Sequence, residues 1–112
     1  MSLKYSIKNR KGSFPRRLDH VVWKVMGEKA VLLNLEDGNY FDVDRVGLSI
    51  WTLCDGKTEM NGILASISKK FKQSPEKINR DLRAYLQTLE RQRLVTTTST
   101  PAKKARKFKI RK

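Results

Sequence analysis

Residues 20–43, HVVWKVMGEKAVLLNLEDGNYFDV, decide the fold class of this 112-residue chain. β-branched and aromatic residues gather there in three short runs, a composition typical of β-strands. The runs cover residues 20–26, 29–35 and 39–43. Alternation along the second run puts three apolar side chains on one face of a strand, namely Val31, Leu33 and Leu35. The stretch therefore predicts three consecutive strands.

Two dipeptides between these runs predict how the strands connect. Gly27-Glu28 suits a two-residue type II′ turn, because glycine at the first position adopts a positive φ. Asp37-Gly38 suits a type I′ turn, in which both central residues need a positive φ. Tight turns join neighbouring antiparallel strands, so the sequence predicts a three-stranded antiparallel β-meander.

Apolar residues then recur at helical spacing in three segments. Asp44 is a good N-cap for the first helix, and Thr58 is the expected N-cap of the second. Ser74 followed by Pro75 predicts the start of the third helix, over residues 75–92. Strands followed by helices predict an α+β domain: a three-stranded antiparallel β-meander followed by three helices, winged helix-turn-helix-like.

The formal charge of +14 is unevenly distributed along the chain. Residues 1–18 carry six basic groups and residues 96–112 carry seven, with no acidic group in either segment. Residues 19–95 carry twelve basic and eleven acidic groups. We therefore expect a basic, flexible N-terminal arm (1–18), one domain (19–95) and a basic, disordered tail (96–112). Such segments are either solvated or in contact with an acidic partner or nucleic acid.

Groups for catalysis or metal binding are few in this sequence. His20 is the only histidine, so no histidine pair can hold a metal ion. Cys54 lies on an apolar helical stripe, so we expect it to be a buried, inert thiol. Four side chains near the second turn suggest calcium, but their spacing does not fit a calcium loop: Asp37, Asn39, Asp42 and Asp44. We expect no enzyme activity, no metal and no cofactor.

The sequence also bears on the compartment. No run of 18 apolar residues is present, and the N-terminal residues lack the apolar region of a secretory signal. A single cysteine cannot form an internal disulfide. These features predict a cytoplasmic protein that does not cross a membrane.

The third predicted strand, residues 39–43, has an open edge. It contains neither proline nor lysine, the residues that usually protect such edges. If Phe41 and Val43 face the helices, Tyr40 and Asp42 face away. An edge of this kind can accept a peptide as an additional strand. The alternative is an ordinary short edge, protected by its length or by dimerisation.

Four motifs in this order resemble the coenzyme PQQ synthesis protein D family: VLLNLEDGNYF, VDRVGLSIW, LCDG and SPEKINRDLRAYLQTLERQRLV. The resemblance covers roughly residues 16–95. It implies a three-stranded sheet with three helices, and a non-catalytic adaptor that binds the leader of a ribosomally made precursor peptide. The adaptor would present that peptide to a modifying enzyme, often a radical S-adenosylmethionine enzyme, or to a leader peptidase.

Position by position, the resemblance implies that the leader lies beside strand 39–43 and helix 75–92. The corresponding peptide-binding residues are Tyr40, Phe41, Asp42, Val43, Ile78, Asp81, Leu82, Tyr85 and Leu86. The sequence leaves open whether the protein is a monomer or a dimer.

A small winged-helix DNA-binding transcription regulator is the alternative function. The three-helix set and the basic ends favour it. Against it, the third helix carries Glu76 and Asp81 among its basic residues, so its exposed face has mixed charge.

Overall fold

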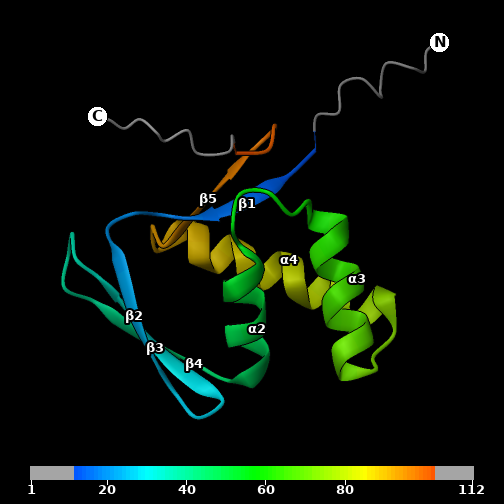
Figure 1. Cartoon of the computed structure of the whole chain (residues 1–112), viewed down its shortest axis with the longest axis horizontal. Coiled ribbons are helices and arrows are strands. Elements are labelled where there is room, and N and C mark those ends of the chain that lie inside the picture. The colour runs from blue at the N-terminus through cyan, green and yellow to red at the C-terminus, as the bar shows by residue number, and fades with distance from the viewer. Residues whose placement is uncertain (1–11, 103–112) are drawn as a thin grey trace, which may run out of the picture.

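The computed structural model describes residues 12–102 of the chain. Within them a three-stranded antiparallel sheet precedes three helices, which confirms the predicted α+β class (Figure 1). A second, two-stranded sheet joins the beginning and end of the described chain. The elements in order are β1 (Phe14–Arg17), β2 (Val21–Met26), β3 (Lys29–Asn34), β4 (Tyr40–Val43), α2 (Arg45–Leu53), α3 (Met60–Phe71), α4 (Pro75–Arg91) and β5 (Val95–Thr98).

The central strand of the meander, β3, pairs with β2 on one side and with β4 on the other. Its buried side chains are Ala30, Leu32 and Asn34. The expected apolar face of Val31, Leu33 and Leu35 is therefore the outer one, and Leu35 is 58% exposed. Both faces of this strand carry apolar residues, so alternation alone does not identify the buried side. Asn34 tolerates burial because its Nδ2 donates to the Gln92 carbonyl at 3.2 Å.

Of the two predicted turns, one has the expected backbone and the other does not. Gly27 has a φ of 65°, as a type II′ turn requires at its first central position. The type I′ prediction for Asp37-Gly38 is wrong, because among these two residues only Gly38 has a positive φ. The Gly38 amide donates to the Asn34 carbonyl, and the Asp37 carboxylate accepts from the Asn39 amide. These bonds close a longer loop than the predicted two-residue turn.

The helix starts follow local capping chemistry. Asp44 accepts a hydrogen bond from the Gly47 amide at 2.8 Å, and Ser74 accepts one from Lys77, as predicted. The prediction of Thr58 as N-cap is wrong, because Glu59 caps α3. The Thr58 hydroxyl donates to the Asp55 carboxylate instead.

The core lies between the inner face of the sheet and the three helices (Figure 1). Trp51 of α2 is fully buried at the centre of the core. The ring of Trp23 from β2 packs edge-on against it, with 5.4 Å between the two ring centroids. The Arg17 guanidinium lies over both rings, 5.2 Å from the Trp23 centroid and 5.9 Å from that of Trp51. Its Nη1 also donates to the carbonyls of Trp51 and Thr52 at the end of α2.

The second sheet is antiparallel and was not predicted from the sequence. Phe14 of β1 lies opposite Thr98 of β5, and Arg17 lies opposite Val95. The expectation of a flexible arm up to residue 18 and a disordered tail from residue 96 is therefore wrong for these strands. Phe14 and Val95 are buried, so this sheet contributes to the packed structure. The more distal parts of the expected arm and tail, residues 1–11 and 103–112, lie outside the described residues.

A helix long and apolar enough to cross a membrane does not occur among residues 12–102.

Replacing Val95 with threonine tests the contribution of β5 to the core. Val95 is 2% exposed, so Val95→Thr buries a hydroxyl group in place of a methyl group. We expect it to lower the free energy of unfolding by about 1–3 kcal/mol in urea denaturation. The reverse exchange at the partly exposed Thr97, Thr97→Val, is the matched control and changes it by less than about 0.5 kcal/mol. Equal, small effects at both positions contradict the burial of β5.

Cys54 offers a second test, based on pKa. Burial raises the pKa of its thiol to about 12, and its Sγ donates to the Ile50 carbonyl. The thiol therefore stays protonated at neutral pH, and we expect a thiol-specific reagent to leave it unmodified in the native protein. In urea it reacts at the rate of an ordinary cysteine. Since the sequence has one cysteine, the signal has no second source. Rapid labelling without denaturant contradicts the structure.

Candidate functional site

Among residues 12–102 the meander has two free edges, because β2 and β4 each pair with β3 alone in this part of the chain. On β4 the hydrogen-bond direction follows from one contact: the Asn34 amide donates to the Asn39 carbonyl at 2.9 Å. Backbone groups of an antiparallel strand point alternately toward and away from the partner. Asn39, Phe41 and Val43 therefore direct theirs toward β3. The N–H and C=O groups of Tyr40 and Asp42 point to the free edge.

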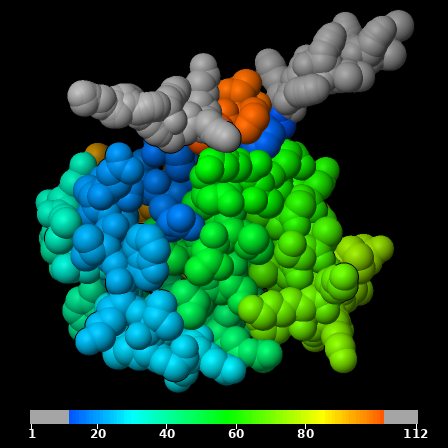
Figure 2. Space-filling view, in the orientation of Figure 1, coloured from blue at the N-terminus to red at the C-terminus, as the bar shows by residue number. Residues whose placement is uncertain are grey.

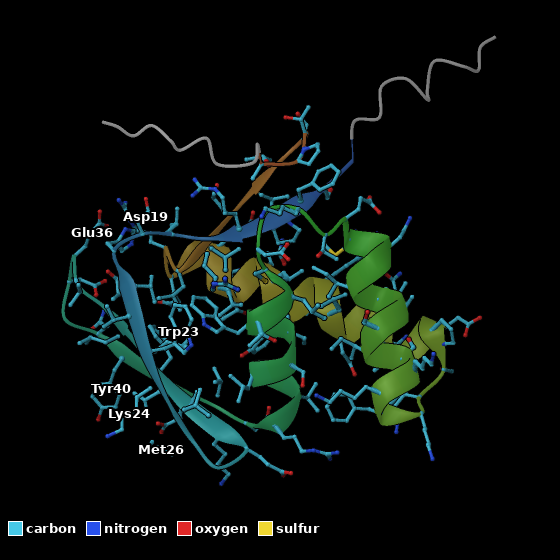
Figure 3. All side chains as sticks on the ribbon, viewed as in Figure 1. Asp19, Trp23, Lys24, Met26, Glu36 and Tyr40 are labelled. Atoms are coloured by element: carbon cyan, nitrogen blue, oxygen red, sulfur yellow. The ribbon has the colours of Figure 1, made fainter. Side chains whose placement is uncertain are left out.

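Side-chain directions on β4 agree with the prediction. Val43 is buried, and Phe41 packs against the core. Tyr40 is 68% exposed, and Figure 3 places it on the side of the sheet remote from the helices. A strand added here gains main-chain bonds at two positions about 7 Å apart.

The loop that leads into β4 is fixed by the connection between α4 and β5. His20 Nε2 lies 2.8 Å from the Arg93 carbonyl oxygen, and the Arg93 side chain pairs with Glu36 at 3.2 Å. The amide of Glu36 in turn donates to the Asn34 side chain. The two contacts of Arg93 span 73 and 57 residues of the chain, and they link the loop before β4 to the end of α4.

A hollow of about 280 Å³ lies between the end of β4 and α4. Tyr85 of α4 forms one wall of it. Burial is the main cause that raises the pKa of the Tyr85 phenol to about 12, and the negative charge of Asp44 is the second. The side chain therefore stays neutral. The residues around this hollow are Lys29, Asp42, Val43, Asp44 and Tyr85.

Gly47 lets Tyr85 approach the first turn of α2. A Cβ atom at Gly47 would lie 2.5 Å from the Tyr85 hydroxyl oxygen. Glycine within a helix lowers the stability of that helix by about 1 kcal/mol relative to alanine. The close approach is the physical reason for a glycine at this position.

Tyr85 also lines a larger cavity of about 620 Å³ between α2, α3 and α4. The wall of this cavity is mainly apolar, with Arg45 and Lys77 among the charged residues. The Arg45 guanidinium lies 4.8 Å from the centroid of the Phe71 ring, and Lys77 Nζ lies 3.1 Å from the Asp81 carboxylate. The apolar lining residues are Val46, Ile50, Ile67, Phe71, Ile78, Leu82 and Tyr85.

The structure brings together some of the predicted site residues and separates others. Asp42 and Val43 meet Tyr85 at the smaller hollow. Three predicted helix residues line the larger cavity, namely Ile78, Asp81 and Leu82. Leu86 is a core residue that borders a different hollow, beside Ser13 and Met60.

Sequence reasoning missed residues that border the site from other elements. Lys29 comes from the start of β3, and Arg45 from the first turn of α2. Asp44 was identified only as a helix cap, although it lines both the hollow and the cavity. Glycine inside the α2 pattern was a usable signal, since it marks a close contact.

The arrangement is suited to binding. Within residues 12–102, no group of three histidine, cysteine, aspartate or glutamate side chains is placed to hold a metal ion. The site presents outward backbone donors and acceptors beside a hollow with both apolar and charged walls, which suits peptide recognition by strand addition.

Comparison with known proteins gives three results. No curated protein is significantly similar. A solved structure, TbiB1 in complex with the TbiA(beta) leader peptide, superposes with a TM-score of 0.66. It is 33% identical in sequence, and the match covers 71% of this chain and 93% of that one. Residues 29–95 match the family of coenzyme PQQ synthesis protein D. With its sheet, three helices and open β4 edge, this chain belongs to the coenzyme PQQ synthesis protein D family.

Proposed function

We propose that the protein is a non-catalytic adaptor for a ribosomally made, modified peptide. It captures the leader of the precursor as a fourth strand on β4, beside α4, and presents the peptide to a modifying enzyme. The outward backbone groups of Tyr40 and Asp42 next to the Tyr85 wall carry the proposal. Membership of the family and the likeness to a leader-peptide complex support it.

Affinity and selectivity come from different parts of this site. Main-chain bonds to β4 are independent of the leader sequence, whereas alternate leader side chains meet the hollow walled by Val43 and Tyr85. Lys29 and Asp42 border the same hollow, so it accepts an apolar side chain with a polar neighbour. An interface of this size is small, below ~1,200 Å², and a Kd of about 1 µM is expected.

The DNA-binding alternative is less well supported by the exposed face of α4. Lys77 and Asp81 form an ion pair there, and Arg83 is hydrogen-bonded to Asn79. A recognition helix needs basic groups free for phosphate contacts. We further propose that the partner enzyme is a radical S-adenosylmethionine enzyme or a leader peptidase, and that the protein is cytoplasmic.

Tyr40→Pro tests strand addition on β4. Proline removes the outward N–H of residue 40 and leaves the ladder to β3 intact. We expect leader affinity to fall roughly tenfold, as measured by titration with a candidate precursor peptide. Tyr40→Thr also removes the ring but keeps the N–H, so the difference between the two variants isolates the backbone bond.

Amide chemical shifts followed in the same titration locate the peptide. Changes concentrated on Tyr40–Val43 and around Tyr85 support the site. If the shifts cluster elsewhere, or if the two substitutions weaken binding equally, the leader does not add to β4.

Gly47→Ala tests the Tyr85 wall. The added methyl group displaces the Tyr85 ring, so we expect leader affinity to fall about three- to tenfold while the fold is retained. Gly62→Ala in α3 is the matched control, because its Cβ meets only the Thr58 methyl group at 3.2 Å. Both exchanges favour a helical backbone. An unchanged affinity in Gly47→Ala shows that Tyr85 does not shape the leader site.

A further inference from the structure

Within residues 12–102 the meander has a second free edge, on β2. The Leu35 amide donates to the His20 carbonyl, so His20, Val22 and Lys24 direct their backbone groups toward β3. The N–H and C=O groups of Trp23 and Val25 therefore point away from the sheet.

Apolar exposure is concentrated on this strand. Four of the seven large apolar side chains that are exposed in the described chain lie in β2: Val22, Trp23, Val25 and Met26. Figure 2 shows β2, in blue, uncovered at the molecular surface. Natural edges are usually blunted by proline or several charges, and β2 has one lysine, Lys24.

Trp23 is exposed, yet it is firmly held. Its ring packs on Trp51 and lies under the Arg17 guanidinium, which is itself anchored by two carbonyls at the end of α2. Tryptophan and arginine in fixed positions are the residues that most often dominate protein–protein interfaces. Figure 3 places Trp23 between the sheet and α2.

Charge at this edge indicates the chemistry of the partner. Arg17 makes its two hydrogen bonds through Nη1, and no ion pair among residues 12–102 includes Arg16, Arg17 or Lys24. A hollow of about 280 Å³ beside Trp23 is lined by both arginines. It also contains Asp19 and Asp55, but Asp55 already accepts hydrogen bonds from the amides of Lys57 and Thr58. The free Arg17 N–H groups therefore suit a carboxylate.

One antiparallel register for pairing with a second copy of the chain is disfavoured at this edge. In the antiparallel register that pairs Trp23 with Val25 of the copy, Lys24 lies directly opposite Lys24 of the copy. Like charges in directly opposed positions destabilise strand pairing.

We infer that β2 is the docking edge for the modifying enzyme, which contributes a strand with a carboxylate facing Arg17 and apolar residues facing Val22 and Met26. This inference rests on the proposed function. An adaptor must hold two partners at once, and the two free edges lie on opposite sides of β3. The leader on β4 and the enzyme on β2 then occupy the same sheet without overlap.

The experiment uses the full-length protein, a candidate precursor peptide and the purified candidate modifying enzyme. Val25→Pro removes an outward N–H from β2, and Val25→Thr keeps it. We expect Val25→Pro to weaken enzyme association roughly tenfold in titration calorimetry, with leader affinity unchanged and Val25→Thr close to wild type. Arg17→Lys keeps the charge but loses the paired donors, and is expected to weaken association with the enzyme as well. Circular dichroism checks that each variant is folded.

The outcomes separate the two proposals. Enzyme association that is absent in the wild type, or equal in Val25→Pro and Val25→Thr, overturns the docking edge whatever happens to the leader. A concentration-dependent dimer that Val25→Pro abolishes also overturns it, because the occupant is then a second copy. Failure of the leader to bind the wild-type protein refutes the proposed function instead.

Discussion

Pairing of β3 on both sides is the constraint on which the remaining structure depends. Its inner face, with Leu32 fully buried, fixes the sheet against α2. Within residues 12–102 its two neighbours have one free edge each, since the three-stranded sheet does not close on itself. The buried face stabilises the domain, while the outer sides of β2 and β4 present the two rows of backbone groups that a partner can use.

Local signals made much of the fold predictable. Asp44 and Ser74 cap their helices because a short polar side chain reaches an amide two or three residues ahead, and this depends on nothing distant. The β1–β5 sheet was not predictable in the same way. It joins segments about eighty residues apart, and neither has the length or apolar alternation of a typical strand.

The site was predictable in part for a similar reason. The free edge of β4 and the inward direction of Val43 follow from strand alternation once the meander is recognised. The sequence did not show which apolar residues of α4 line the larger cavity. Ile78, Leu82 and Leu86 share one apolar stripe, but packing places Ile78 and Leu82 at that cavity and Leu86 at a different hollow. The buried face of β3 was undetermined by sequence because both of its faces are apolar.

Pairing of β1 with β5 brings the two ends of the described segment, residues 12–102, close together. The Gly12 amide donates to the Ser99 carbonyl at 3.0 Å, and Ala102 is bonded to Gly56 nearby. A domain whose ends meet can be spliced into a surface loop of another protein without stretching either connection. The same geometry allows a recognition module of this kind to be carried as a separate chain or as an insertion within a larger enzyme.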